Sequence, residues 1–340
     1  MSRRFFLTVS AVAASTVFGI DTGQRELRAQ TLAARQAGQP YVLRLGGYGP
    51  AETSFSQGLS HIGGELAAQS GGMVDIRYLY NVMDIGYAGG TDIPWLVEAG
   101  LLTMGYTTLS GQAISELELA ALPFVFADTA SARAAMDGPL GQAAARSIEA
   151  QLDVVVLGFF ENGFRHVSNN IRPVHTLADL RDLKIRVLPV QAATFAMLGA
   201  DPQPLPLDQV VAALESGRLD GQENPFANVV TYGLHTLQKY HTATYHSYLS
   251  RAIIVHRPSF EGWPAALQSQ LRSAAKAAIA LQRRLKDDEE AQAAEIIRRA
   301  GGEIVELTPA ARAAFVAAVA PLHAQARQQY APELLALVGL

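Results

Sequence analysis

Apolar and polar positions repeat with two different periods along the chain, and each period predicts a different kind of element. A period of two residues, or a short run that is apolar on both faces, is typical of a strand. Such strands are expected at residues 41–49, 73–80 and 100–108. Between them, residues 51–70 repeat as a helix with Thr53 or Ser54 as its N-cap, and another helix lies near residues 95–99. Strands that alternate with helices predict an open α/β sheet with parallel strands.

The second half of the chain continues this alternation. Further strands are expected at residues 153–160, 183–188, 251–258 and 303–307. The first of them is broken by Glu-Asn-Gly at residues 161–163, and helices cover residues 208–217 and 309–330. Residues 264–300 form one Ala-rich helical pattern, about 55 Å long at about 1.5 Å per residue. This helix either bridges two domains or is kinked near residues 286–290, whose charged run Lys-Asp-Asp-Glu-Glu is interpreted as a solvated face.

The composition of the 340-residue chain favours a folded protein of about two domains, at about 150 residues per domain. With 49% hydrophobic and 17% charged residues, the chain can bury a large core and is not intrinsically disordered. The net charge of -4 and the lack of any Lys/Arg run argue against nucleic acid as a partner. The absence of cysteine excludes disulfides, thiolate metal sites and cysteine nucleophiles.

Residues 1–29 have the features of an export signal. Arg3 and Arg4 precede an apolar run that is short for a membrane span, and the order Ser-Arg-Arg-Phe-Phe-Leu resembles a bacterial twin-arginine signal. Cleavage after Ala29 would start the mature chain near Gln30. We therefore expect a periplasmic protein exported by the twin-arginine route. A membrane anchor and an ordinary secretory signal are the alternatives.

The sequence lacks the usual patterns for metal, phosphate and nucleophile chemistry. The pairs His241 with His246 and His166 with His175 do not have the spacing of helical metal ligands. The strand-to-helix turn at residues 46–54 matches neither glycine-rich phosphate-binding motif, and no nucleophile elbow occurs. We expect no metal, no cofactor and no catalytic residue.

Several polar residues stand on otherwise apolar segments, and each has a structural and a functional interpretation. Arg186 projects from the polar side of its strand, either as a charge on an edge strand or as a bidentate clamp for a carboxylate. Arg165, after Glu-Asn-Gly, has the same two interpretations. Asn224 and Pro225 are typical of a helix start, as N-cap and first helical residue. Glu223 could serve as an acid or base, but no second carboxylate or histidine is spaced to support it.

Four segments occur in a characteristic order: GFRHVSN, VHTLADLRDLKIRVLP, MLGADPQPLPLDQVVAALESGRLDGQENPFANV and LQKYHTATYH. Together they resemble the periplasmic solute-binding proteins of TRAP transporters, the DctP-like family. The resemblance runs from about Tyr41 to the C-terminus and includes ELELAALPFVFAD and FEGWPAALQSQLRSAA. Several separated motifs in one order are more specific than any single motif.

The resemblance implies a two-lobed periplasmic binding protein fold of the α/β class. It has two open mixed sheets, hinge strands and a long domain-spanning helix. Lobe I is expected at residues 41–162 plus about 251–285. Lobe II is expected at residues 163–250 plus about 286–340.

In that family the solute lies between the lobes, so the resemblance also implies ligand-binding roles. Arg186 matches the main carboxylate-binding arginine, and Arg165 and Asn224 match two further contacts with the same ligand group. All three are expected to follow or end strands of an open sheet, where ligands bind. A looser match adds the cleft-wall residues Tyr48, Tyr106 and Leu207. Such a wall indicates a moderately apolar pocket that tolerates aromatic groups.

The resemblance thus implies the substrate-binding subunit of a TRAP transporter. Such a subunit captures a small carboxylate and delivers it to the small and large membrane subunits of the permease. Asn224 would contact the ligand, and Glu223 would have a supporting role. Two other functions stay open: an exported enzyme on a similar fold with Glu223 or Asp220 as general base, and a periplasmic ligand sensor that docks on a receptor.

Overall fold

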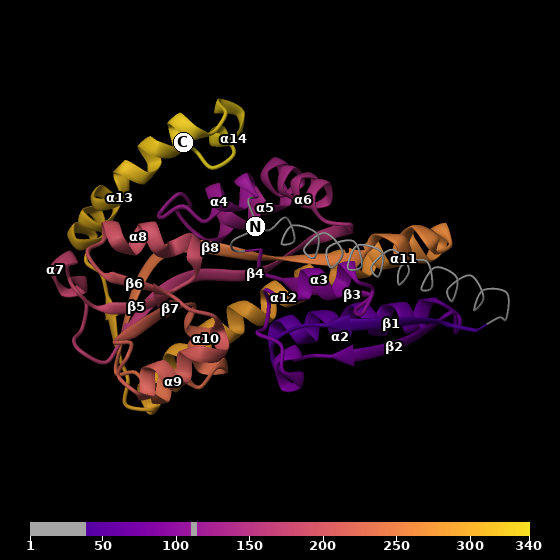
Figure 1. Cartoon of the computed structure of the whole chain (residues 1–340), viewed down its shortest axis with the longest axis horizontal. Helices are drawn as coiled ribbons and strands as arrows, with labels where there is room; N and C mark the ends of the chain where they lie inside the picture. The colour runs from indigo at the N-terminus through magenta and orange to yellow at the C-terminus, as the bar shows by residue number, and fades with distance from the viewer. Residues whose placement is uncertain (1–38, 110–113) are drawn as a thin grey trace, which may run out of the picture.

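The computed structural model describes residues 39–109 and 114–340, so the predicted export signal lies outside the described residues. Within those ranges, nine strands form one hydrogen-bonded sheet in the order β2-β1-β3-β8-β4-β7-β5-β6, with β9 paired to β8. The strands are β1 (Tyr41–Gly46), β2 (Val74–Leu79), β3 (Met104–Thr107), β4 (Val154–Asn169), β5 (Lys184–Val187), β6 (Asp201–Pro204), β7 (Gly221–Asn224), β8 (Tyr240–His256) and β9 (Glu303–Glu306). Figure 1 shows β4 and β8 running side by side through the middle of the molecule.

Helices cover the sheet on both halves of the molecule. The α-helices are α2 (Ser54–Gln69), α3 (Ile93–Glu98), α4 (Ser115–Ala120), α5 (Thr129–Asp137), α6 (Pro139–Gln151), α7 (Leu177–Leu180), α8 (Ala192–Met197), α9 (Val210–Glu215), α10 (Phe226–Thr231), α11 (Arg257–Gly262), α12 (Ala265–Arg299), α13 (Pro309–Gln329) and α14 (Pro332–Ala336). Short 3-10 helices are η1 (Val82–Ile85), η2 (Pro189–Gln191), η3 (Leu207–Gln209) and η4 (Leu234–Thr236). The predicted elements are present, with Thr53 as the N-cap of α2, whereas β6, α4 to α8, α11 and α14 were not predicted.

The sheet is mixed, and each half contains the parallel strands that the alternating pattern predicts. β1 pairs in parallel with β2 and β3 in one half, and β5 pairs in parallel with β6 and β7 in the other. β4 and β8 are antiparallel to each other and continue through both halves. The two mixed sheets expected from the resemblance are therefore joined into one ladder by two shared strands.

β4 passes through Glu-Asn-Gly, where the sequence predicts a break. Its pairing with β8 shifts register between Glu161 and Gly163, and Gly163 has a φ of +90°, which glycine adopts without strain. The bulge absorbs the polar residues without ending the strand, so the predicted break is wrong. Arg165 consequently lies inside a long strand, rather than following or ending one.

β8 is also longer than the predicted strand, which started at Arg251. Its first part carries the buried polar residues His241, Thr242, Thr244, His246 and Ser247. Such residues give no alternation of apolar and polar positions, so the pattern does not reveal this half of the strand. Both β4 and β8 depend on tertiary pairing for their full length.

α12 is one helix of 35 residues. It packs on α2 and β4 in one half of the molecule and on α10 and β9 in the other. The bridging interpretation is therefore confirmed, and residues 286–290 lie within an uninterrupted helix.

Two main hydrophobic cores give the molecule its two lobes. The larger core gathers side chains of β1, α2, β3, α6 and the first part of α12. The second gathers β5, α8 and the first part of α13, including Phe315 and Val319. The C-terminal segment then returns to the larger core through Ala326, Leu335 and Val338. The residue limits given above for the two lobes stay a prediction.

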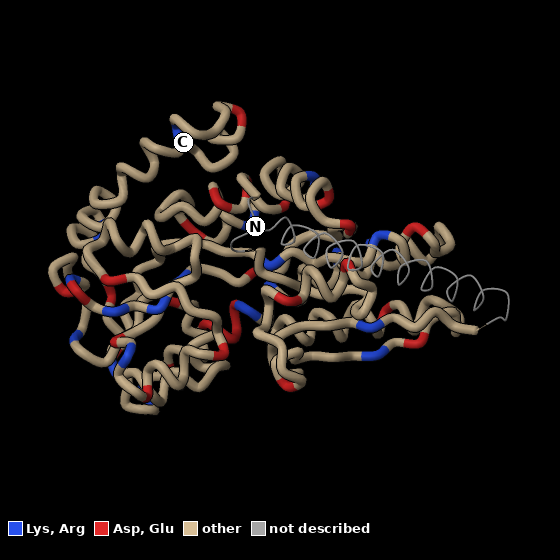
Figure 2. Tube along the Cα trace, viewed as in Figure 1, with Lys and Arg blue, Asp and Glu red and all other residues tan. Residues whose placement is uncertain are grey.

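Charged residues of both signs are interspersed along the trace, and neither sign gathers along one face in the view of Figure 2. Among residues 39–109 and 114–340, no helix combines the length and the apolar character that crossing a membrane requires.

Candidate ligand-binding site

A cavity of about 260 Å³, here called the ligand cavity, is lined by residues from both halves of the sheet. Its wall combines loops that follow β1 and β3 with residues of β5, β7 and the segment after β6. Five of the six predicted ligand-binding residues line it: Tyr48, Arg165, Arg186, Leu207 and Asn224. The structure therefore brings most of the predicted ligand-binding residues to the wall of one cavity.

Tyr106, the sixth, lies behind the wall rather than on it. Its side chain is fully buried and stacks on Phe55, with ring centroids 5.0 Å apart. Its hydroxyl accepts a hydrogen bond from the backbone N–H of Tyr48 at 3.2 Å. Tyr106 thus supports the segment that carries Tyr48, which itself faces the cavity.

Arg165 is held in place by Glu223. Its Nε donates to Glu223 Oε2, and its Nη2 donates to Glu223 Oε1 at 2.9 Å and to Asn224 Oδ1 at 3.1 Å. Both side chains are almost completely buried. The Nη1 of Arg165 is buried and has no hydrogen-bond partner within the described part of the chain. One end of the guanidinium is therefore fixed, and the other has an unused donor.

Glu223 is ionised in this environment. Burial raises the pKa of its carboxyl, but the charge and hydrogen bonds of Arg165, together with the nearby His246, outweigh burial and lower the pKa to about 2. His246 lies 3.4 Å from Glu223 Oε2, and burial lowers the pKa of that imidazole. The carboxylate thus neutralises Arg165 and fixes its orientation, which is the supporting role expected from the resemblance.

Arg186 lies on β5, between β7 and β6, so its interpretation as a charge on an edge strand is wrong. Its side chain is 3% exposed, and its Nε donates to the carbonyl oxygen of Leu205 at 2.8 Å. Burial lowers the pKa of the guanidinium to about 10, which leaves it charged at neutral pH. No carboxylate in the described ranges hydrogen-bonds to it.

Asn224 ends β7 and is not the N-cap of the next helix, contrary to the prediction. Pro225 occupies the N-cap position of α10, and a proline side chain cannot accept a hydrogen bond. The carboxylate of Glu290 on α12 caps the helix instead. It accepts hydrogen bonds from the backbone N–H groups of Phe226 at 2.8 Å and Ala227 at 3.0 Å. Asn224 is therefore free of the capping role, and its amide faces Arg165 at the cavity wall.

Residues 286–290 form the predicted solvated face only in part, because Asp287 and Asp288 are exposed whereas Lys286 is buried. Lys286 is 2% exposed and donates to Oδ1 of Asn228, a residue of the cavity wall, at 3.2 Å. Asp287 pairs with Arg133, and Glu290 lies 3.6 Å from the Lys286 ammonium group. The buried side of this turn of α12 therefore contacts the N-terminus of α10 and a residue of the cavity wall.

The sequence profile described as "Bacterial extracellular solute-binding protein, family 7" matches residues 48–329. The chain belongs to this family. A solute-binding protein of Verminephrobacter eiseniae is 32% identical over 273 residues, which are 78% of this chain and 79% of that protein. The family consists of solute-binding proteins, and two relatives of this chain, from Escherichia coli and Rhodobacter capsulatus, are named periplasmic binding proteins.

Two solved TRAP periplasmic solute-binding proteins have the same fold as this family 7 chain. One, from Bordetella bronchispeptica, has density interpreted as pantoate. It is 27% identical with a TM-score of 0.80, and the match covers 88% of this chain and 98% of that one. The other, from a Bradyrhizobium species, is a complex with galacturonate. It is 28% identical with a TM-score of 0.79, and the match covers 87% of this chain and 97% of that one.

Two residues of the cavity wall in this family 7 protein were not predicted: Arg251, which is buried, and Tyr232, which is partly buried. Arg251 of β8 is 5% exposed; its Nε donates to the Tyr48 hydroxyl, and its Nη1 donates to the Ser250 carbonyl at 3.1 Å. Tyr232 follows α10, and burial raises the pKa of its phenol. In the sequence, Arg251 could have been recognised as a candidate only because it is a charged residue at the start of the apolar run RAIIV. No sequence pattern indicates a binding role for Tyr232.

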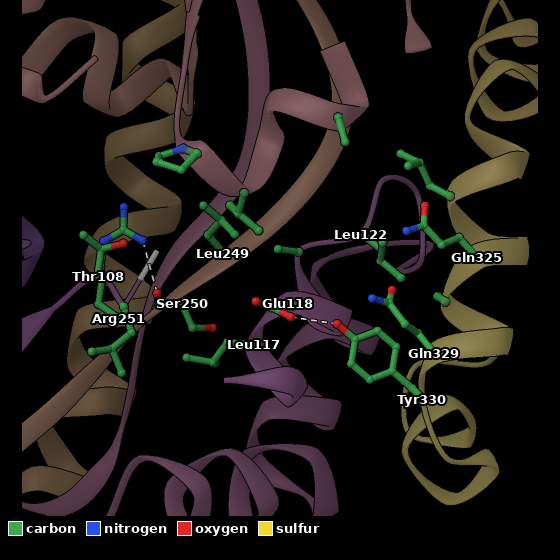
Figure 3. Close-up of a pocket in the computed structure, with 17 residues that line it drawn as sticks. Thr108, Leu117, Glu118, Leu122, Leu249, Ser250, Arg251, Gln325, Gln329 and Tyr330 are labelled. Atoms are coloured by element: carbon green, nitrogen blue, oxygen red, sulfur yellow. Dashed lines mark hydrogen bonds between the residues drawn. The ribbon is translucent and has the colours of Figure 1, made fainter. Parts of the chain in front are cut away.

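A second cavity, of about 390 Å³, adjoins the ligand cavity and shares Thr108, Pro189 and Arg251 with it. Figure 3 shows it between β8 and α13, with α4 below. At its far end the hydroxyl of Tyr330 donates to Glu118 Oε2 at 2.7 Å, which links α13 to α4. Within the described residues, no group of three or more His, Asp or Glu side chains is arranged to hold a metal ion.

Proposed function

We propose that this family 7 protein binds a small organic acid in the ligand cavity, with the carboxylate of the ligand on Arg186 and Arg165. Arg186 carries the proposal, because it is buried at the cavity wall and its described neighbours include no paired carboxylate. A buried cation without a counter-ion is costly, so an anionic ligand is its expected partner. Pantoate and galacturonate, the acids in the two neighbouring structures, have this chemistry.

Arg186, Arg165 and Asn224 would each form a different contact with the ligand carboxylate. The terminal nitrogens of Arg186 would form a bidentate pair, which is strong and geometrically selective. The unused Nη1 of Arg165 would add a second charge-assisted bond, and the amide of Asn224 would add a neutral one. The cavity of about 260 Å³ lies just below the range of about 300–1,000 Å³ that is common for small-molecule sites, which suits a short-chain acid.

The proposal includes binding without turnover. Glu223, one of the two bases considered from the sequence, has a pKa of about 2 and is held by Arg165, so it is a weak base at neutral pH. Asp220, the other, accepts a hydrogen bond from the backbone N–H of Lys184 at 2.8 Å and does not line the ligand cavity. Bound ligand should therefore be recovered unchanged, as one-dimensional NMR of the mixture can establish.

We further propose that the protein reaches the periplasm by the twin-arginine route. There it would deliver its ligand to the small and large membrane subunits of a TRAP transporter. Ligand uptake by vesicles that contain both subunits should depend on added protein. Uptake that is unchanged by the protein, together with ligand-dependent binding to a receptor, would favour the sensor alternative.

The ligand class is tested by a thermal-shift screen followed by calorimetry, with monocarboxylates, dicarboxylates, sugar acids and aromatic acids. At least one acid should raise Tm, and Arg186→Ala should weaken its binding at least about tenfold, which is about 1.4 kcal/mol. Arg77→Ala is the matched control, because Arg77 is exposed on β2 and pairs only with Asp75 in the described structure. A hit that persists in Arg186→Ala would overturn the clamp, and stabilisation only by uncharged sugars or peptides would overturn the acid ligand.

A further inference from the structure

The second cavity, of about 390 Å³, is larger than the ligand cavity and meets it at one end. Thr108, Pro189 and Arg251 line both spaces. Hydrogen bonds from Arg251 to the Tyr48 hydroxyl and to the Ser250 carbonyl hold its guanidinium group against the wall. Because the two cavities share this wall, a ligand longer than the ligand cavity has a place into which it can extend.

Apolar side chains form much of the wall of the second cavity. Figure 3 shows some of them between Arg251 at one end and Tyr330 at the other. The apolar lining includes Leu117 of α4, Leu122, Val190 of η2, Leu249 of β8 and Leu322 of α13. All five side chains are buried or half-buried. Water gains no hydrogen bonds from such a wall, so its displacement by a hydrocarbon group is favourable.

This apolar wall belongs to both lobes. Leu117 packs against the larger hydrophobic core, whereas Leu322 is part of the second core. A ligand group between them would contact both lobes at once. It would therefore stabilise the arrangement in which the lobes lie close together, because a ligand favours the state with which it makes more contacts.

The two ends of the second cavity carry opposite charges. Arg251 lies at the end shared with the ligand cavity, and the carboxylate of Glu118 lies at the far end. The Oε2 of Glu118 accepts a hydrogen bond from the Tyr330 hydroxyl at 2.7 Å. A ligand carboxylate is attracted by the arginine and repelled by the glutamate. An acid would therefore lie with its carboxylate in the ligand cavity and an uncharged tail toward Glu118.

We infer that the second cavity binds the tail of the acid whose carboxylate lies on Arg186, and that the ligand is an elongated monocarboxylic acid with an apolar tail. The inference rests on the proposed function, which places the carboxylate in the ligand cavity. The ligand cavity of about 260 Å³ would hold the head of the molecule, and the second cavity would hold the rest. A second acid group at the end of the tail would approach Glu118 and weaken binding.

Calorimetry with butyrate, hexanoate, octanoate and decanoate measures the contribution of the tail. Each methylene group that is removed from water raises the affinity about fourfold, which is about 0.8 kcal/mol. We expect the wild type to bind octanoate at least about tenfold more tightly than butyrate. Equal affinities for butyrate and octanoate would overturn the inference.

Ala193→Trp tests whether the tail lies in the second cavity. Ala193 of α8 lines this cavity but not the ligand cavity, and it is exposed, so a larger side chain there disturbs no core. The indole should reduce the affinity ratio of octanoate to butyrate to about twofold or less. Ala196→Trp, at an exposed position of the same helix outside both cavities, is the matched control and should leave the ratio unchanged. A ratio that survives in Ala193→Trp would overturn the inference.

Suberate tests the orientation of the tail, because it has the chain of octanoate with a second carboxylate in place of the terminal methyl group. The wild type should bind suberate at least about tenfold more weakly than octanoate. Glu118→Gln keeps an acceptor for the Tyr330 hydroxyl but removes the charge, so it should reduce this difference at least about threefold. Glu215→Gln, at an exposed position of α9, should leave the difference unchanged. An equal difference in wild type and Glu118→Gln would overturn the assignment of the tail to this cavity.

The same titrations distinguish failure of this inference from failure of the proposed function. Binding of short acids that does not depend on chain length and is lost in Arg186→Ala would overturn the tail site and leave the acid-binding function intact. Binding of pantoate or galacturonate by a wild type that binds no alkanoate would have the same meaning. Absence of binding by every acid tested would overturn the proposed function itself.

Discussion

Glu289 and Glu290 are neighbours on α12, yet they accept hydrogen bonds from helices in opposite halves of the molecule. Glu289 accepts from the backbone N–H and the hydroxyl of Ser54, the first residue of α2. Glu290 accepts from the first two backbone N–H groups of α10. Negative charge at a helix N-terminus satisfies free donors and the helix dipole. One turn of the bridging helix therefore joins both lobes where they meet.

Removal of either carboxylate should destabilise the protein. Glu290→Ala leaves the N-terminus of α10 without a cap, because Pro225 cannot replace it, and should lower the free energy of unfolding by about 1–2 kcal/mol. Urea unfolding at pH 7 measures the change. Glu295→Ala on the exposed face of the same helix is the control, with an expected change within about 0.5 kcal/mol. Equal effects of the two substitutions would contradict the capping role of Glu290.

The buried pair of Arg165 and Glu223 predicts a second effect on stability. Glu223→Gln leaves the Arg165 charge buried without its partner, and loss of one member of such a pair costs about 3–5 kcal/mol. The folded pKa of Glu223, about 2, lies below the unfolded value of 4.5, so its stabilisation is complete above pH 4.5 and is lost as pH falls toward 2. Urea midpoints of wild type and Glu223→Gln should therefore converge below pH 4.5. A gap that stays constant down to pH 2.5 would show that the ion pair does not cause it.

The sequence predicts the residues of this cavity wall better than it predicts the contacts of α12 beside it. Arg186 and Asn224 lie near strand ends, where local pattern is informative, and the family motifs led to Arg165, which also lines the cavity. Of the three residues given by the looser match, Tyr48 and Leu207 line the cavity and Tyr106 does not. The cap of α10 could not be predicted, because Glu290 reaches it from 64 residues away in the chain. Lys286 was assigned to solvent for the same reason: its burial depends on packing between lobes, and an i, i+4 charge pattern looks identical on an exposed helix.

His241 predicts a separate loss of stability at milder pH. Burial lowers the pKa of its imidazole to about 4, against 6.5 in the unfolded chain, so the unfolded state takes up the proton first. The free energy of unfolding should therefore fall as pH decreases from about 6.5 to 4, and His241→Gln should make this decrease shallower. His175→Gln, a substitution at an exposed position, is the control. Parallel pH profiles for wild type and His241→Gln would rule out this contribution.

Gly90 should be required for ligand binding, because it leaves room for the Tyr48 ring. A Cβ at residue 90 would lie 2.6 Å from Cε1 and 2.7 Å from Cζ of Tyr48, closer than carbon atoms pack. The ring cannot easily retreat, since Tyr106 packs against it with centroids 5.0 Å apart and Arg251 holds its hydroxyl. Gly90→Ala should push Tyr48 into the ligand cavity and weaken ligand binding at least about tenfold, about 1.4 kcal/mol by calorimetry.

Gly64→Ala provides the matched control for that substitution. Gly64 lies within α2, and a Cβ there meets no atom within 4 Å. Alanine is the better helix former by about 0.5–1 kcal/mol, so this variant should be slightly more stable and bind ligand as the wild type does. If Gly90→Ala binds equally well while its folded state is intact, Tyr48 does not form the rigid wall that this geometry implies.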